Sequence, residues 1–389
     1  MSRRWLTSAA YLVVILFFGL SVLGVVGRAS APPGAVRASE AASTPPYVYA
    51  LYRLFPRPRV TGFYENDAST PGGTGSYASF VAHARSLNVL SPLWYAIGPT
   101  GEVARDRSQP LVIRKAKAAG VALMPLVTNL GSNMLTSPGP RAAAVRSLVR
   151  IASHPGYRGV IIDFELLPPS ARPGLTALVD EVYYRLHATG RRLGVAVFPK
   201  VGVPGTLPLA YDYRNLGRHA DEVVLMAYDA HYDGGPPGPV APFPWVKANL
   251  LYALRFIPRS RVYLGLGFYG YDWSDPTGGS AVTLSMPEAY ARARANGVPV
   301  LWDAASGEGH YRYAGHVVWF ETPHSLAEKA SMARRYAVGG VAIWRLGFEA
   351  PGTWDTVMRA LATGRPPTLP RGAAETAAGG GVVAGGAGA

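Results

Sequence analysis

The feature of this chain that most restricts its fold is the stretch GVIIDFE at residues 159–165. Its apolar run predicts a buried strand, yet two carboxylates stand two residues apart at its far end. Side chains alternate along a strand, so Ile161, Asp163 and Glu165 share one face while the other face is wholly apolar. If the apolar face packs under helices, the carboxylates look into a parallel barrel at its C-terminal mouth, where barrel enzymes keep their catalytic groups.

The two carboxylates are expected to affect each other's ionisation. Two strand steps separate Asp163 from Glu165 by roughly 6 to 7 Å. At an effective dielectric constant near 20, ionising both costs on the order of 2.5 kcal/mol, which approaches two pKa units. One of the pair is therefore expected to keep its proton near neutral pH, as a general acid must.

Short apolar runs alternate with amphipathic stretches along the body of the chain, a pattern that favours a parallel sheet wrapped by helices. The expected strands are at residues 60–64, 89–94, 122–128, 159–165, 193–198, 222–228, 262–268 and 341–344. Apolar residues at helical spacing predict helices at 141–153, 174–189 and 246–256. Eight parallel strands close a (β/α)8 TIM barrel, so the predicted fold class is α/β.

The connection between the seventh and eighth strands, at about residues 274–320, is much longer than the others. It contains a helical piece at 287–296 and strand-like pieces at 298–302 and 316–320. We therefore expect a small α+β insertion here, within a barrel domain that spans residues 59–365.

The two ends of the chain read differently from its body. In residues 1–31 a basic start precedes a long apolar run and an Ala-Ser-Ala sequence, which predicts a cleaved signal peptide. The run is also long enough to span a bilayer, so an uncleaved signal anchor is the alternative. Both interpretations place the body outside the cytoplasm, secreted, in the cell wall or anchored to the outer face of the membrane. Residues 32–58 read as a Pro/Ala-rich linker, and the Gly/Ala-rich tail at 366–389 is expected to be disordered.

Composition excludes several kinds of chemistry. The chain has no cysteine, so disulfides, thiol nucleophiles and thiolate metal sites are excluded. The net charge of +14 comes mostly from scattered arginines, which indicates either a solvated surface or attraction to an anionic cell wall. Scattered arginines argue against a nucleic-acid partner. The histidines are scattered as well, so no metal or other cofactor is expected.

Polar and aromatic residues collect where the expected strands end. They are Tyr64, Glu65, Trp94, Tyr95, Asn129, Asp163, Glu165, Tyr228, Asp229, Tyr269 and Trp344. Their accumulation on one rim predicts a cleft lined by aromatic platforms, which suit the apolar faces of sugar rings.

Several of these residues belong to motifs that resemble glycoside hydrolase family 18, the chitinase-like barrels. The motifs are GVIIDFE at 159–165, MAYD at 226–229 and Trp344. The chain also resembles the branch of spore cortex-lytic N-acetylglucosaminidases, through YDY at 211–213, GLGFYGYDW at 265–273, VWFE at 318–321 and WRLG at 344–347. The resemblance runs from about residue 60 to 358, in order and on the expected elements.

The resemblance implies retaining, substrate-assisted cleavage of a β-linked N-acetylhexosamine, an exception to the two-carboxylate scheme of most glycosidases. It implies that Glu165 is the acid, that Asp163 orients the acetamido group of the substrate, and that Tyr228 hydrogen-bonds its carbonyl. The residues implied to shape the subsite are Met226, Asp229 and Trp344, with Tyr64 and Glu321 as weaker candidates for its walls. The expected partner is a peptidoglycan or chitin-like polysaccharide, bound by a monomer that touches a membrane only through an uncleaved N-terminal segment.

The chain departs from the family motif at two positions. The acidic residues expected four and seven residues before the acid are Ile161 and Arg158. Ile161 removes a carboxylate that could share a proton with Asp163, so a slower reaction or a moved pH optimum is expected.

The sequence is compatible with three functions. Cleavage of spore-cortex peptidoglycan is the first, and a chitinase is an alternative that the catalytic residues do not separate from it. A wall-binding lectin on the same barrel is an alternative of another class. The retained Asp163 and Glu165 argue against the lectin, whereas Ile161 keeps it open.

Overall fold

The structure is a computed structural model that describes residues 56–66, 75–274, 276–366 and 368. The predicted signal segment at 1–31 lies outside the described residues, as does nearly all of the predicted linker and tail. Within the described part of the chain, no helix is both long and apolar enough to cross a membrane.

Parallel strands close into a barrel, which confirms the predicted fold. The barrel closes because β1 pairs with β2 on one side and with β15 on the other. In chain order the strands are β1 (Arg59–Tyr64), β2 (Val89–Ile97), the interrupted pair β4 (Ala122–Leu123) and β5 (Leu126–Asn129), β6 (Gly159–Asp163), β7 (Arg192–Val197), β8 (Glu222–Leu225), β9 (Val262–Gly267) and β15 (Gly340–Trp344). A short strand that was not predicted, β3 (Val103–Asp106), pairs antiparallel with the end of β2.

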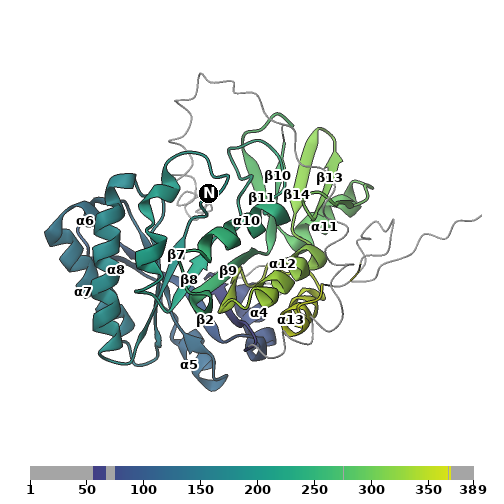
Figure 1. The fold of residues 1–389 in the computed structure, drawn as a ribbon. Helices are drawn as coiled ribbons and strands as arrows, with labels where there is room; N and C mark the ends of the chain where they lie inside the picture. Colours follow the sequence, from purple (N-terminus) through teal and green to yellow (C-terminus); the bar gives the residue numbers. More distant parts are fainter. Residues whose placement is uncertain (1–55, 67–74, 275, 367, 369–389) are drawn as a thin grey trace, which may run out of the picture.

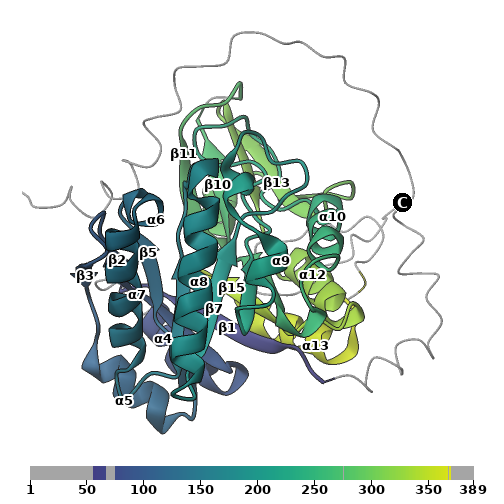
Figure 2. The same ribbon diagram turned by 60° about the vertical axis from the view of Figure 1, so that its left-hand side comes forward.

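Helices cover the outside of the barrel (Figures 1 and 2). They are α4 (Ser76–His83), α5 (Pro110–Ala118), α6 (Asn133–Thr136), α7 (Pro138–Ala152), α8 (Arg172–His187), α9 (Tyr213–Leu216), α10 (Phe243–Ala253), α12 (Pro323–Arg335) and α13 (Thr353–Thr363). Helices α7, α8 and α10 match the three predicted helices and begin two or three residues earlier, because Pro138, Pro173 and Pro244 suit the first turn of a helix.

Period-two alternation divides the apolar residues of the strands into two cores. The inner core fills the barrel with one or two side chains from every strand, among them Phe63, Ile161, Val224 and Ala342. The larger outer core lies between the strands and the helices and takes the alternate residues, such as Val160 and Ile162 of β6. Strand parity therefore decides whether a side chain near a strand end can reach the barrel mouth.

The long connection after β9 forms a second, antiparallel sheet with one helix, seen at the upper right of Figure 1. Its elements are β10 (Tyr269–Trp273), β11 (Ala281–Ser285), α11 (Met286–Ala295), β12 (Leu301–Asp303), β13 (Glu308–Tyr313) and β14 (His316–Phe320). The predicted α+β insertion is thus present, but its sheet begins at Tyr269 rather than near residue 274. β9 ends at Gly267, and the N–H of Phe268 donates to the carbonyl of Trp344, 2.6 Å away, just before the chain enters β10.

A buried ion group ties this insertion to the barrel. Lys329 of α12 contacts the carboxylates of Glu308 and Glu321, and all three side chains are enclosed. Glu308 also accepts the backbone N–H groups of Val240 and Ala241, at 2.8 and 2.6 Å. Burial lowers the pKa of Lys329, but the two carboxylates more than offset this and raise it above its ordinary value. The amine therefore stays charged and balances one of the two carboxylates, while burial and the charge of Glu308 raise the pKa of Glu321 to about 8.

We expect Lys329→Met to destabilise the protein by about 3–5 kcal/mol, because it leaves two buried carboxylates without their cation. Urea denaturation at pH 7 measures the difference. Arg185→Met is the matched control, since Arg185 forms an exposed ion pair with Glu181 at 2.7 Å and its loss should cost less than about 1 kcal/mol. Equal costs for the two variants would contradict a structural role for the buried group.

Candidate active site

Strand β6 delivers the two carboxylates to the mouth of the barrel. Ile161 belongs to the inner core, and Val160, Ile162 and Phe164 belong to the outer core, as the alternation predicts. Asp163 is the last residue of the strand and is 9% exposed. Glu165 lies just beyond the strand and is partly accessible.

The Asp163 and Glu165 carboxyl groups hydrogen-bond to each other. Burial, the neighbouring charges of Asp163 and Asp229, and this hydrogen bond all raise the pKa of Glu165 well above its usual range. Burial also raises the pKa of Asp163, while the hydrogen bond from Glu165 limits that rise. Glu165 therefore carries the shared proton and Asp163 accepts it, so the pair has one acid and one base.

One oxygen of Asp163 has a special position. The Oδ1 atom is buried and has no hydrogen-bond partner among the described residues. A buried acceptor without a donor costs roughly 1–3 kcal/mol. The surrounding side chains therefore leave this acceptor unsatisfied.

Asp229 supplies a third carboxyl group at the mouth, four residues beyond the end of β8 at Leu225. Its Oδ1 accepts the hydroxyl groups of Tyr269 and Tyr271, at 2.5 and 2.9 Å. The Asp229 residue as a whole is exposed to solvent, but its Oδ1 atom faces two buried tyrosines of β10. Burial raises the pKa of Asp229, and the two hydroxyl donors limit the rise. The insertion thereby contributes directly to the site, by holding this carboxylate.

Aromatic and sulfur-containing side chains form the apolar part of the mouth. Trp344, at the end of β15, and Tyr228, after β8, are half-buried and pack against the inner core, which includes Met226. The ring of Trp344 lies 5.5 Å from that of Phe63, and the ring of Tyr228 lies 6.0 Å from that of Tyr269. The predicted residues Met226, Tyr228 and Trp344 thus adjoin one apolar surface.

Two predicted wall residues are not brought to this surface. Tyr64 packs in the outer core, and its hydroxyl donates to Gln109 Oε1 at 2.8 Å. Glu321 is fully enclosed and contacts Lys329 and Ser325, which leaves no surface for a ligand. The geometry therefore gives Tyr64 and Glu321 structural contacts rather than a place in the mouth.

The rim prediction also included Trp94 and Tyr95, and both pack in the outer core. The Trp94 indole donates to Asn66 Oδ1 at 2.8 Å, and the Tyr95 hydroxyl is 3.0 Å from that of Tyr157. In their place, Phe63 and Phe198 reach the inner core. Parity was the signal that could have found Phe198, since it lies two residues after the inward-facing Ala196.

Ile161 fills the barrel directly below Asp163. It is fully buried, and a Cβ atom on Gly194 of the neighbouring strand would come within 2.8 Å of its Cγ1. Because Gly194 has no side chain, Ile161 occupies the space between β6 and β7. The layer beneath the carboxylates is therefore apolar at this position.

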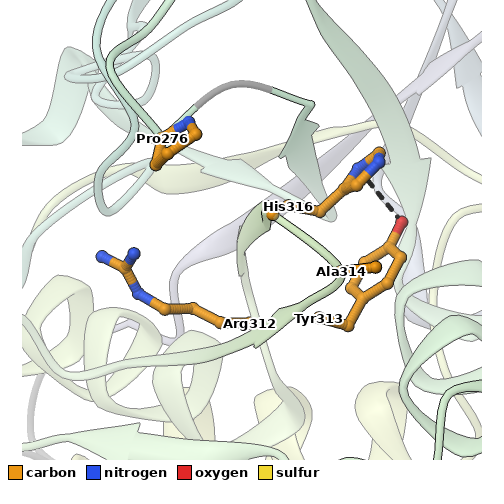
Figure 3. A pocket seen from close by; sticks show the side chains of 6 residues that line it. Pro276, Arg312, Tyr313, Ala314 and His316 are labelled. Carbon is orange, nitrogen blue, oxygen red and sulfur yellow. Dashed lines mark hydrogen bonds between the residues drawn. The ribbon is translucent and has the colours of Figure 1, made fainter.

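No metal centre is found in the described part of the chain, where no group of three or more His, Cys, Asp or Glu could hold an ion. A hollow of about 330 Å³ lies on the insertion and is lined by Pro276, Arg312, Tyr313, Ala314 and His316 (Figure 3). None of the predicted site residues lines this hollow. The barrel mouth is therefore the place where the candidate catalytic groups meet.

Comparisons with known proteins agree with this geometry. The family model of the glycosyl hydrolases of family 18 matches residues 115–349. The cortical fragment-lytic enzyme of Bacillus subtilis (strain 168) is 30% identical over 257 residues, which are 61% of this chain and 60% of that enzyme. A chitinase structure from Chromobacterium violaceum ATCC 12472 has a TM-score of 0.72 and 27% identity, and covers 78% of this chain and 99% of its own. The structure of the spore cortex-lytic enzyme SleL of Bacillus megaterium QM B1551 has a TM-score of 0.70 and 25% identity. The match covers 78% of this chain and 74% of the SleL chain.

The raised pKa of Glu165 predicts a pH-dependent gain in stability for Glu165→Gln. Below the pKa of the unfolded chain, both states bind the proton and the carboxyl costs nothing. As the pH rises above that value, the unfolded state ionises while the folded state does not, so wild type loses stability relative to the variant. We expect the variant to melt higher at pH 8, by about 2–4 °C for each kcal/mol relieved, and the difference to vanish near pH 4. Glu181→Gln, at an exposed carboxylate of α8, should show no such trend, and a flat difference for both variants would refute the prediction.

Proposed function

Since the chain belongs to the glycosyl hydrolases of family 18, we propose that it is a retaining, substrate-assisted glycosidase. It cleaves β-linked N-acetylglucosamine in a cell-wall polymer, and spore-cortex peptidoglycan is the proposed substrate. The observation that carries this proposal is the contact of Glu165, whose pKa burial raises, with Asp163, whose Oδ1 lacks a donor. One group can give a proton, and the other can accept an N–H from the substrate.

Glu165 is the proposed acid. Its raised pKa keeps the proton available near neutral pH, and its partial accessibility lets a glycosidic oxygen approach. The proton passes to the leaving oxygen as the bond to the anomeric carbon breaks. The acetamido oxygen of the substrate forms the new bond to that carbon, so no carboxylate of the protein becomes attached to the sugar.

Asp163 is the proposed orienting base. An acetamido N–H donated to Asp163 Oδ1 would satisfy the buried acceptor and turn the acetamido oxygen toward the anomeric carbon. Tyr228 is proposed to hydrogen-bond the acetamido carbonyl, beside the apolar surface that includes Met226. Trp344 offers a half-buried ring as the floor under the sugar. Asp229, held by two tyrosines, borders the same subsite.

The proposed substrate rests on similarity to the cortical fragment-lytic enzyme and to SleL. A chitin oligomer is the second candidate, because the chitinase of Chromobacterium violaceum has the TM-score of 0.72 given above. Both polymers contain β-linked N-acetylglucosamine, so the same acid and base serve either one. A wall or cortex polymer lies outside the cytoplasm, and we therefore also propose that residues 1–31 direct export.

We expect Glu165→Gln to lower cleavage by on the order of 100-fold or more, because it removes the general acid, while sugar binding stays within a few fold of wild type. Release of reducing ends from purified cortex, vegetative wall and chitin oligomers measures cleavage, and co-sedimentation with the same polymers measures binding. Release from cortex with a new N-acetylglucosamine reducing end would support the proposed substrate, whereas faster release from chitin would favour the second candidate.

Glu181→Gln is the matched control, since it makes the same change at an exposed residue outside the site and should leave cleavage unchanged. Binding by wild type without release from any polymer would replace the glycosidase with a lectin. Full activity of Glu165→Gln would remove Glu165 from the mechanism.

Substitution of Ile161 tests whether the absence of a carboxylate at this position affects the ionisation of Asp163. Ile161→Asn places an amide donor below Asp163, which should lower the pKa of Asp163 and move the acid limb of kcat/KM to lower pH. Ile161→Asp adds a like charge, which should raise that pKa and move the limb to higher pH. The two side chains have nearly the same size, so the packing loss is common to both. Identical profiles for the two variants would show that this layer does not govern the ionisation of Asp163.

A further inference from the structure

The peptide that carries Glu165 lies beyond the regular part of the sheet. The ladder between β5 and β6 ends at the Thr128–Asp163 pair, and the ladder between β6 and β7 ends at the Ile162–Val195 pair. Leu166 has φ of 54°, so the chain turns away immediately after Glu165. Strand pairing therefore does not fix the backbone of the acid, and other groups must do so.

Asn129 hydrogen-bonds the backbone of Glu165 beyond the end of the ladder between β5 and β6. Its Oδ1 accepts the Glu165 N–H at 2.8 Å, and its Nδ2 donates to the Glu165 carbonyl at 3.1 Å. The same Nδ2 also donates to the carbonyl of Gly131 at 3.1 Å, which holds the amide group in plane. A side-chain amide thus makes with Glu165 the two hydrogen bonds that a backbone peptide would make in a sheet.

Tyr211 holds the preceding residue from the other side. Its hydroxyl donates to the carbonyl of Phe164 at 2.7 Å. The Tyr211 side chain is 1% exposed, and its ring lies 5.8 Å from that of Phe198. The hydroxyl is therefore fixed by packing, and it reaches the Phe164–Glu165 segment from the connection between β7 and β8.

We propose that Asn129 and Tyr211 are positioning residues for the acid, which clamp the Phe164–Glu165 backbone so that the Glu165 carboxyl meets the glycosidic oxygen. The proposal rests on the glycosidase function proposed above. A general acid must lie within hydrogen-bond reach of the atom it protonates. A misplacement of about 1 Å can cost on the order of 100-fold in rate. The clamp supplies this accuracy at a place where the strand no longer does.

The test compares two leaving groups on one glycone, because only a poor leaving group needs the acid. The substrates are the phenyl and 2,4-dinitrophenyl β-glycosides of the same N-acetylated glycone. Asn129→Leu removes all the hydrogen bonds of the amide at nearly constant volume. We expect it to lower kcat on the phenyl glycoside by about 100-fold and on the dinitrophenyl glycoside by less than about 5-fold, with KM nearly unchanged. Tyr211→Phe keeps the ring and should show the same inequality at a smaller size.

Asn249→Leu is the matched control. Asn249 also clamps backbone, since its Oδ1 accepts the N–H groups of Lys200 and Val201 at 2.8 and 2.7 Å, but it does not contact Phe164 or Glu165. Loss of stability alone would lower both rates equally, so the ratio of the two kcat values should stay at the wild-type value in this variant. An unchanged ratio in Asn129→Leu would overturn the proposal.

Amide hydrogen exchange separates failure of the clamp from failure of the proposed function. Inactivity of the wild-type protein on both glycosides would contradict the proposed glycosidase function. The exchange rate of the Glu165 amide would still be measurable. We expect that amide to be protected in wild type and to lose protection in Asn129→Leu. The Ile161 amide, bonded to the Pro125 carbonyl at 2.9 Å, should keep its protection. Equal protection of Glu165 in both proteins would also overturn the proposal.

Discussion

The mouth of this barrel is organised around the cost of placing three carboxyl groups in one confined space. Burial raises the pKa of Asp163, Glu165 and Asp229, and the charges of Asp163 and Asp229 raise the pKa of Glu165 further. The protein stabilises the three carboxyl groups to different degrees. Asp229 receives two tyrosine hydroxyls, Asp163 receives a hydrogen bond from Glu165, and Glu165 keeps the proton. Because their hydrogen bonds differ, one of these three similar side chains can act as an acid, one as a base and one as a fixed acceptor.

The rest of the fold serves to keep these groups in place. Strand parity sends Asp163 inward, the insertion brings Tyr269 and Tyr271 to Asp229, and the buried Lys329 holds the insertion against the barrel. Each support is itself buried, so it cannot relax without exposing apolar surface or an unpaired charge. Buried supports of this kind suit the accurate positioning that an acid requires.

The fold was predictable from the sequence because closed parallel barrels need apolar residues on both faces of every strand, and these runs are easy to see. The inner face of β6 was also predictable, since two carboxylates mark it. Strand β1 has no such mark: Phe63 and Tyr64 are both aromatic, and only pairing with neighbouring strands decides which one faces inward. The enclosure of Glu321 depends on Lys329, eight residues away on the next helix, and no local pattern shows that contact.

The apolar layer under the carboxylates bears on how the proton is shared. A carboxylate at position 161 would offer Asp163 a second partner below the mouth, but Ile161 packs against Gly194 and offers none. Glu165 is in direct contact with Asp163, and Asp229 acts on Glu165 through its charge. A ligand that donates to Asp163 Oδ1 would stabilise the ionised form of Asp163 and lower its pKa. Ligand binding would then increase the difference between the acid and the base, because Asp163, which shares the proton of Glu165, would become a weaker base.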